Sequence, residues 1–272
     1  MPVSPQLADG MITAALAAGR AIMAVYATDF EARDKSDRTP VTEADETAEA
    51  IILEHLARLA PEVPVIAEES VAAGRIPEIG KRFFLVDPLD GTREFIGRRD
   101  EFTVNIALIE DGRPLAGVVY APALGRLFAG TEGGAVEFEI EDFRLGTARP
   151  IAVARPGSPL RVVASRSHRT AETDRFIAEY PGAETVSAGS SLKFCLVASG
   201  AADLYPRLGR TMEWDTAAGH AVLAGAGGIV VKADGSPLDY GRAEQANETP
   251  FANPWFFAAS DSALIEPGRA VL

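Results

Sequence analysis

Two segments near the start of the chain carry apolar residues at every third or fourth position. The segments are residues 7–26 and residues 42–59, and both place polar side chains between the apolar ones. Such spacing predicts two amphipathic helices, each of which buries one face. Pro61 follows the second segment and helps to end that helix.

Beyond residue 64 the pattern changes to short apolar runs that Gly, Pro and Asp residues separate, and such runs predict strands. These strands are expected at residues 65–67, 83–86, 103–109, 115–120 and 127–129. Asp111 and Gly112 stand between two of them and form a strong hairpin signal. Two helices followed by hairpin-linked strands favour a layered α+β arrangement.

The periodicity disappears at residues 146–159, where Gly and Pro cluster. We expect a domain boundary there, with an N-terminal domain at residues 1–150 and a C-terminal domain at residues 151–272. Beyond the boundary, strands and helices are predicted to alternate, which implies an α/β class for the second domain. The strands are expected at residues 162–165, 185–187, 204–205, 228–231 and 256–259, and the helices at residues 170–180, 191–199 and 216–224.

The composition limits the kinds of function that the chain can have. With 272 residues, of which 47% are hydrophobic, the chain can bury a sizeable core. Its formal net charge of -13 argues against general binding to nucleic acid or to anionic membranes, because a field of that sign repels phosphate groups. Any anionic ligand must therefore meet cations close to its site.

A single cysteine and the absence of a long apolar run limit the location of the protein. Cys195 stands alone, so no intrachain disulfide is possible, and its neighbours Phe194 and Leu196 indicate a buried packing residue in a reducing compartment. The N-terminal segment has no basic stretch followed by an unbroken apolar core, and no run of about 18 apolar residues occurs. We therefore expect neither export nor a membrane span.

The stretch FFLVDPLDGTREF, residues 83–95, ends an apolar run with two carboxylates that are three positions apart, Asp87 and Asp90. Pro88 makes the turn rigid, and Gly91 allows a ligand to approach the backbone. Two carboxylates this close repel each other unless a cation lies between them. Because no His or Cys is near, the oxygen donors indicate a hard divalent cation such as Mg²⁺.

Other acidic residues stand at similar places, and each has an ordinary structural explanation as well. Glu68 and Glu69 follow a strand-like run and could form a solvated loop, while Asp215 could be a helix N-cap. Thr42 and Asp45 fit a capping box, and DPLDG alone could be a type I turn. Taken one at a time, these signals leave both interpretations open.

Taken together, the motifs TPVTEAD (39–45), AEES (67–70), DPLDGTREF (87–95) and EWDTAAGHA (213–221) resemble the inositol monophosphatase superfamily of metal-dependent, lithium-sensitive phosphatases. The stretches EFTVNIALIEDGRPLAGVVYAP, ASRSH, GSSLKFCLVASG and LYPR look like its CysQ branch, the 3′(2′),5′-bisphosphate nucleotidases. The departures are small: Thr39 stands where Ser often precedes the proline, and Arg93 where Lys is common.

The resemblance implies a fold and a metal site. The fold would be a two-domain αβαβα sandwich, with two to three magnesium ions bound where the domains meet. The implied metal ligands are Glu68, Asp87, the backbone carbonyl of Leu89, Asp90 and Asp215, with Asp87 shared by two ions. Thr92, together with Glu68 or Asp45, would orient the attacking water and take its proton, and the resemblance leaves open which acid is the base.

The same resemblance implies substrate contacts. Near the metals these are Glu68, Asp90, Gly91, Thr92 and Asp215. A second phosphate would meet Gly189, Ser190, Ser191, Lys193 and Arg207, and His168 would contact the nucleotide. Without the resemblance, Lys193 reads as a solvated helix lysine, Arg207 as a member of a surface ion pair and His168 as a loop histidine.

The activity that the resemblance implies is hydrolysis of the 3′-phosphate of 3′-phosphoadenosine 5′-phosphate (PAP) to AMP, which clears a by-product of sulfate assimilation. The phosphosulfate analogue PAPS is a second candidate substrate. The alternatives are an inositol-1-phosphate phosphatase with the same metal chemistry and a non-catalytic nucleotide sensor. We expect a monomer or homodimer in the cytoplasm, with peripheral association at the inner membrane as an open alternative, and no nucleic-acid partner.

Overall fold

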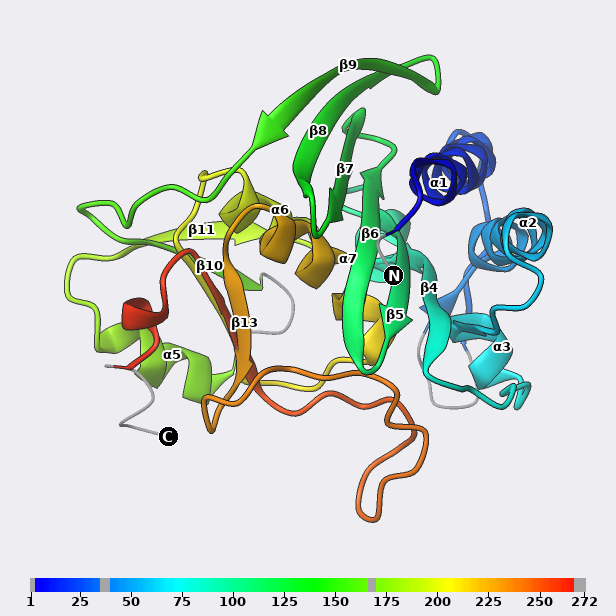
Figure 1. The fold of residues 1–272 in the computed structure, drawn as a ribbon. Helices are drawn as coiled ribbons and strands as arrows, with labels where there is room; N and C mark the ends of the chain where they lie inside the picture. Colours follow the sequence, from blue (N-terminus) through cyan, green and yellow to red (C-terminus); the bar gives the residue numbers. More distant parts are fainter. Residues whose placement is uncertain (1–2, 35–39, 166–169, 267–272) are drawn as a thin grey trace.

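The chain folds into five layers, in the order helices, sheet, helices, sheet, helix (Figure 1). The computed structural model describes residues 3–34, 40–165 and 170–266. The outer helices on one side are α1 (Pro5–Tyr26) and α2 (Glu43–Leu59), and they pack on each other and on the first sheet. The layered sandwich that the resemblance implies is therefore present.

The first sheet has seven strands in the order β3-β4-β5-β6-β7-β8-β9, parallel between β3 and β4 and antiparallel elsewhere. Its strands are β3 (Val65–Ala67), β4 (Arg82–Asp90), β5 (Thr103–Glu110), β6 (Arg113–Ala121), β7 (Arg126–Thr131), β8 (Gly134–Glu141) and β9 (Arg144–Ile151). The predicted hairpin is confirmed, since Asp111 and Gly112, both with positive φ, join β5 to β6. Short helices α3 (Glu68–Ala72) and α4 (Thr92–Ile96) follow β3 and β4.

The second sheet has five strands in the order β11-β10-β12-β14-β13, and it is mixed. Strand β10 pairs in parallel with β11 and β12, whereas β14 runs antiparallel to β12 and β13. The strands are β10 (Arg161–Ser165), β11 (Glu184–Ala188), β12 (Leu204–Arg207), β13 (Ile229–Lys232) and β14 (Phe256–Ala259). The remaining elements are α5 (Ala171–Ala178), α6 (Leu192–Ala198), α7 (Glu213–Gly225), the 3-10 helix η1 (Ser262–Leu264) and the short pair β1 (Arg33–Asp34) and β2 (Pro40–Val41).

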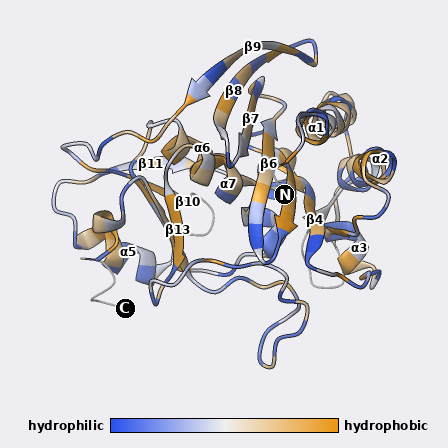
Figure 2. Ribbon diagram, viewed as in Figure 1, coloured by the Kyte–Doolittle hydropathy of each residue, from blue (hydrophilic) through white to orange (hydrophobic). Residues whose placement is uncertain are grey.

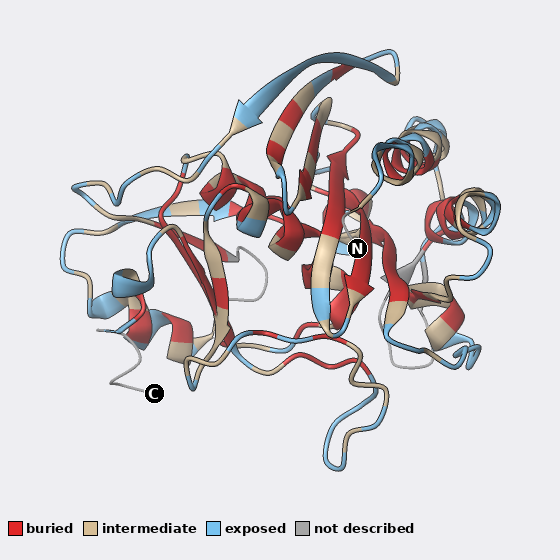
Figure 3. Cartoon of the chain, viewed as in Figure 1, coloured by how far each residue is buried: buried red, intermediate tan, exposed pale blue. Residues whose placement is uncertain are grey.

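Helices α6 and α7 form the middle layer, and the buried residues around them belong to one apolar cluster that includes both sheets. Figures 2 and 3 show the hydrophobic, buried strands on either side of these helices. Helix α7 lies very close to the first sheet, because a Cβ on Gly117 would stand 2.4 Å from the carbonyl oxygen of Ala218. The division into domains at residue 150 stays a prediction, since this core joins residues from both sides of it.

Strands β8 and β9 are absent from the predicted set, and β9 lies where we expected a boundary. Residues 144–150 of β9 are all exposed (Figure 3), so no hydrophobic alternation marks this strand in the sequence. It forms through pairing with β8 across a turn at Asp142 and Phe143, both of which have positive φ. Cys195, in contrast, is fully buried in α6 as predicted.

By length and composition alone, α1 could cross a membrane. In the fold, its inner face is buried against α2 and β6, with Met11, Ala15 and Ile22 fully covered. This is the arrangement of a core helix, which agrees with the expectation of no membrane span.

Candidate active site

A cavity of about 230 Å³ opens between the ends of the first sheet and the start of α6 and α7. Most of the predicted site residues line it, although the sequence brings them from five separate segments. The predicted residues in its wall are Glu68, Asp87, Leu89, Asp90, Gly91, Thr92, Gly189, Ser190, Lys193, Arg207 and Asp215. Asp45 and Ser191 contact wall residues from behind, and His168 lies outside the described residues.

The two aspartates of DPLDG lie at the end of β4 and are held by an irregular pairing with β5. Asp87 pairs with Asn105, the register then shifts, and Asp90 pairs with Thr103. The backbone N–H of Leu89 donates to Asp87 Oδ1 at 3.0 Å. The alternative of an ordinary turn is therefore wrong, because β4 continues through Asp90 with an irregularity that turns both carboxylates towards the cavity.

Gly91 follows at φ 92°, a left-handed conformation that favours glycine. A Cβ there would stand 3.3 Å from the carbonyl oxygen of Glu101. The glycine therefore also allows another part of the chain to lie close, and because Gly91 lines the cavity, its predicted contact with a ligand stays a prediction.

Thr92 begins α4 and links the β4 end to α2. Its hydroxyl lies 3.1 Å from Asp45 Oδ1 and 3.3 Å from the carbonyl oxygen of Leu89. Asp45 Oδ2 accepts the N–H and the hydroxyl of Thr42, at 2.8 and 2.7 Å. Asp45 therefore does both things that the sequence suggested: one carboxylate oxygen completes the capping box and the other holds Thr92.

Glu68 is placed beside Asp87 by the parallel pairing of β3 with β4. Ala67 pairs with Val86, so the next residues, Glu68 and Asp87, leave adjoining strands at the same edge. The alternative of a solvated loop is wrong, because Glu68 is the first residue of α3. The start of this helix is held from α2, where Glu49 accepts the N–H of Glu69 at 2.7 Å.

Asp215 is the third residue of α7, at the helix start as its motif predicted, and its Oδ2 accepts the backbone N–H of Met212 at 2.8 Å. The alternative of a helix N-cap is wrong, because Met212 occupies that position. Burial, together with the negative charges of Asp90 and Glu68, raises the pKa of Asp215 to about 8. Removing this charge from water and placing it near two other carboxylates is unfavourable unless a proton or a cation compensates.

The donors on this side of the cavity suit magnesium. We call Glu68, Asp87, Asp90 and Asp215 the carboxylate side. With the Leu89 carbonyl they offer only oxygen atoms, which hard cations prefer. Among the described residues, no three Asp, Glu, His or Cys side chains stand close enough to enclose an ion alone. Water and substrate oxygens would have to complete the coordination, as they usually do for Mg²⁺, so the metal site stays a prediction.

The wall of the same cavity also carries cations, and we call Lys193, Arg207 and Arg210 the cationic side. Lys193 and Arg207 are buried, so the alternatives of a solvated lysine and a surface ion pair are wrong. Lys193 Nζ donates to the carbonyl of Ser190 and lies over the Tyr205 ring. Burial lowers the pKa of Lys193 to about 8, and Arg207 adds to this effect while Asp90 opposes it.

Arg207 holds one arm of its guanidinium against the backbone, with an N–H donated to the Arg210 carbonyl at 2.8 Å. Its buried Nε has no hydrogen-bond partner in the described part of the chain. Arg210 was missed from the sequence, although LYPRLGRT contains this second arginine three residues after the first. Its side chain reaches the cavity and is held by Thr249 Oγ1 at 2.8 Å.

The Gly189–Ser191 stretch joins α6 to the carboxylate side. The Gly189 N–H donates to Glu101 at 2.9 Å, and the hydroxyls of Ser190 and Ser191 lie 2.7 and 3.0 Å from Asp90 Oδ2. The polar groups of all three residues therefore face carboxylates of the chain itself. Their predicted contact with a second phosphate stays a prediction.

The chain is similar to known proteins along nearly all its length. A sequence profile described as the inositol monophosphatase family matches residues 5–263. The 3′(2′),5′-bisphosphate nucleotidases CysQ of Salmonella typhimurium and Escherichia coli K12 are 48% and 47% identical to it over 241 residues, which cover 88% of this chain and 94% of each relative.

Solved structures agree with the sequence relatives. CysQ from Bacteroides thetaiotaomicron has a TM-score of 0.77 at 38% identity, and the match covers 94% of this chain and 97% of that one. An inositol monophosphatase from Anabaena has a TM-score of 0.74 at 27% identity, and the match covers 97% of this chain and 94% of that one. The chain therefore belongs to the inositol monophosphatase family, in the branch of the CysQ-type bisphosphate nucleotidases.

Proposed function

We propose that this chain is a magnesium-dependent 3′(2′),5′-bisphosphate nucleotidase, which hydrolyses the 3′-phosphate of PAP to AMP and inorganic phosphate. The observation that carries the proposal is one cavity with a carboxylate side and a cationic side, in which Lys193 and Arg207 are buried. A ligand with two separate phosphates suits this division, because bound cations can receive one phosphate and the cationic side the other. The CysQ relatives support the same activity.

The carboxylate side and the Leu89 carbonyl would hold the magnesium ions, two to three by the resemblance. Bound magnesium would neutralise phosphate charge and supply a water molecule of lowered pKa. The hydroxyl of Thr92, anchored by Asp45, can orient that water. Glu68 lines the cavity directly, whereas Asp45 reaches it through Thr92, so the two candidate bases differ in their access to the proton.

The main rival is an inositol-1-phosphate phosphatase. The carboxylate side serves both reactions equally well, since each releases a phosphate from a secondary alcohol. The buried cations favour the nucleotidase, because a charge such as Lys193 is costly to bury and an inositol monophosphate has no second phosphate to meet it. A non-catalytic nucleotide sensor is disfavoured by the anchored Thr92, because a binder needs no positioned water.

Phosphate release from PAP, adenosine 3′-monophosphate and inositol 1-phosphate, with and without Mg²⁺, tests the proposal. We expect PAP to react fastest and only with Mg²⁺. Loss of the 5′-phosphate removes charge-assisted contacts of about 1.5–3 kcal/mol each, so KM for the monophosphate should rise about 10- to 100-fold. Faster release from inositol 1-phosphate would support the rival phosphatase, and PAP binding without release would support the sensor.

Further details remain part of the proposal. The same assay with PAPS compares the two nucleotide substrates, and added Li⁺ tests the lithium sensitivity that the resemblance implies. A role in the cytoplasm and a monomeric or homodimeric state stay predictions.

A further inference from the structure

A long connection between β13 and β14, residues 233–255, has no helix or strand of its own and projects from the molecule as the orange loop at the bottom of Figure 1. Structureless loops longer than about 12–15 residues are uncommon in compact domains and are usually functional. The returning half of this loop lies against residues 211–213, which lead into α7 and Asp215.

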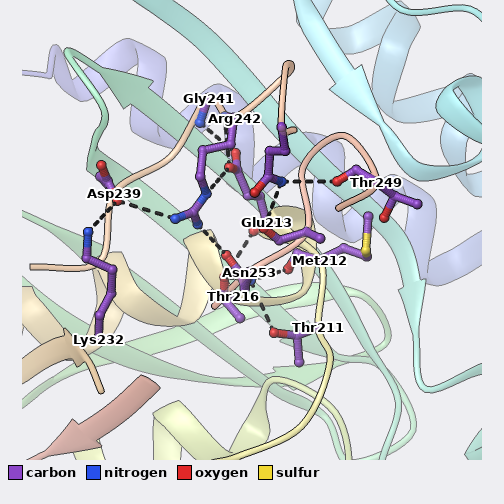
Figure 4. A network of polar contacts seen from close by, with 12 residues as sticks. Thr211, Met212, Glu213, Thr216, Lys232, Asp239, Gly241, Arg242, Thr249 and Asn253 are labelled. Carbon is purple, nitrogen blue, oxygen red and sulfur yellow. Dashed lines mark hydrogen bonds and ion pairs between the residues drawn. The ribbon is translucent and has the colours of Figure 1, made fainter. Parts of the chain in front are cut away.

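Glu213 makes the first connection between the loop and α7 (Figure 4). Its side chain is fully buried, and its carboxylate accepts the backbone N–H groups of Gly241 and Arg242 at 2.6 and 3.0 Å. The Arg242 guanidinium forms an ion pair with the same carboxylate at 3.2 Å. The Glu213 N–H in turn donates to the Phe251 carbonyl at 2.8 Å. Glu213 thus holds both limbs of the loop, one through its buried carboxylate and the other through its backbone N–H.

Asn253 makes the second connection, and Arg242 joins it to the first (Figure 4). The Asn253 amide Nδ2 lies 2.7 Å from the Met212 carbonyl, 3.0 Å from Thr216 Oγ1 and 3.2 Å from Thr211 Oγ1. Its backbone N–H donates to the Thr211 carbonyl at 2.9 Å. One side chain therefore fixes the residues before and after Asp215.

Met212 connects these contacts to the Asp215 carboxylate. The Met212 carbonyl is held by Asn253, and the Met212 N–H donates to Asp215 Oδ2. One oxygen of Asp215 is thereby fixed to the backbone, which orients the carboxylate at the cavity wall. The loop also holds Arg210 through Thr249 and so reaches the cationic side.

We propose that Glu213 and Asn253 are positioning residues, which set the Asp215 carboxylate for magnesium by holding Met212 through the loop at residues 233–255. This inference rests on the proposed function, since it needs Asp215 to bind the ion. The contacts belong to the class of outer interactions that orient metal ligands, and loss of one typically weakens metal affinity about 10- to 100-fold.

The test compares Asn253→Ala and Glu213→Gln with wild type in two measurements on the whole chain. Calorimetry of Mg²⁺ binding without substrate should give a Kd raised about 10- to 100-fold. In phosphate release, the Mg²⁺ concentration for half activity should rise in parallel, while KM for PAP at saturating Mg²⁺ changes much less. If the two residues had a purely structural role, the variants would lose thermal stability, but the Mg²⁺ requirement would not change more than KM for PAP.

Glu137→Gln is the matched control. Glu137 is also a buried glutamate held by arginines, with Arg126 Nε at 2.7 Å, but it lies on β8 away from the cavity. We expect it to lower the melting temperature and to leave the Kd for Mg²⁺ unchanged. Equal weakening of Mg²⁺ binding in this control, or wild-type Kd values in both folded test variants, would overturn the proposal.

Arg242→Ala keeps the inference testable if the buried substitutions fail to fold. The Arg242 side chain is 21% exposed, so its removal leaves Glu213 and Asn253 in place but breaks the link between them. We expect a rise of a few fold in the Kd for Mg²⁺, and an unchanged value would count against the proposal. If wild type binds Mg²⁺ but releases no phosphate from PAP, the proposed function fails while the positioning role is still measured by calorimetry.

Discussion

The carboxylate side and the cationic side of the cavity are built from different kinds of structure. Three of the four carboxylates lie on or directly after neighbouring strands, so the pairing of β4 with β3 and with β5 places them. The cations come from the buried start of α6, the end of β12 and the loop beyond it. One side is thus assembled by strand register, and the other by the packing of a second sheet against a helix.

The two sides meet different requirements of the proposed reaction, which are the binding of magnesium and the binding of a second phosphate. On the carboxylate side, Asp90 accepts hydrogen bonds from the hydroxyls of Ser190 and Ser191, and Asp215 accepts the backbone N–H of Met212. Lys193 is buried, and its pKa is lowered because burial of its charge is unfavourable. A buried cation is unfavourable unless it is paired, so the presence of Lys193 in the cavity that we propose to bind magnesium supports the proposal that the ligand carries a second anionic group.

The largest effect is expected from Asp90→Asn, which tests the carboxylate side. Loss of an outer contact to a metal ligand already lowers activity about 10- to 100-fold, so loss of a ligand should lower kcat/KM at least about 100-fold. The fold should survive, because the hydroxyls of Ser190 and Ser191 can reorient around an amide. Phosphate release and circular dichroism measure the two outcomes.

Asp111→Asn is a suitable control for this substitution. Asp111 has positive φ in the exposed hairpin between β5 and β6, and asparagine tolerates that conformation. Its activity should match wild type. Near-normal turnover by Asp90→Asn would remove Asp90 from the mechanism.

The carboxylate side could be predicted from the sequence more fully than the cationic side. Glu68, Asp87 and Asp90 stand in short motifs directly after apolar runs, so their meeting at one sheet edge could be anticipated. Arg210 was missed, because nothing within LYPRLGRT tells which arginine the second sheet turns inward. The burial of Lys193 and Arg207 is likewise invisible without the packing of α6 between two sheets.

A smaller but specific effect is expected from Lys193→Met, which tests the cationic side. Methionine keeps most of the buried volume but removes the charge. KM for PAP should rise about 10- to 100-fold, the value of a charge-assisted hydrogen bond, while KM for adenosine 3′-monophosphate changes little. Steady-state phosphate release with both substrates provides the comparison.

Lys232→Met is the corresponding control, because Lys232 on β13 pairs with Asp239 outside the cavity. It should leave both KM values unchanged. If Lys193→Met raised both values equally, Lys193 would not distinguish the bisphosphate from the monophosphate.

The dependence of Mg²⁺ binding on pH tests the carboxylate side through the proton on Asp215. The raised pKa of Asp215, about 8, means that the metal-free protein holds a proton there below that pH. Magnesium must displace this proton, so the apparent Kd should rise about tenfold for each pH unit below about 8 and level off above it. Calorimetry between about pH 6 and 9 measures the slope.

A rise in pH should have opposite effects on the two properties: it strengthens Mg²⁺ binding but lowers the stability of the metal-free protein. Because the folded pKa of Asp215 exceeds its unfolded value, the metal-free protein should lose stability as pH rises towards 8, and added Mg²⁺ should reverse the loss. In Asp215→Asn, residual Mg²⁺ binding should lose most of its dependence on pH. An unchanged slope in that variant would assign the proton to another group.

The two N-terminal helices were predictable from the sequence because one face of each is buried, whereas the exposed strand β9 was not, and β8 was missed although its burial alternates. The expected α1 and α2 differ from the observed helices by no more than a few residues, because their apolar stripes face the first sheet. Strand β9 is exposed along residues 144–150, and only its pairing with β8 makes it a strand. A boundary inferred from lost periodicity therefore fell on an edge strand.

The smallest effect is expected from Cys195→Ala, which separates the charge of Lys193 from the position of α6. Cys195 lies two residues further along the same helix and is fully buried, with its pKa raised by burial. Loss of its sulfur should lower the free energy of unfolding by about 1 kcal/mol, measured by urea denaturation. Cys195 is not among the residues that line the cavity, so KM for PAP should stay within about twofold of wild type, a change of under 0.5 kcal/mol by the usual conversion. A KM rise comparable to that of Lys193→Met would mean that the placement of the helix, and not the lysine charge, determines how the second phosphate is bound.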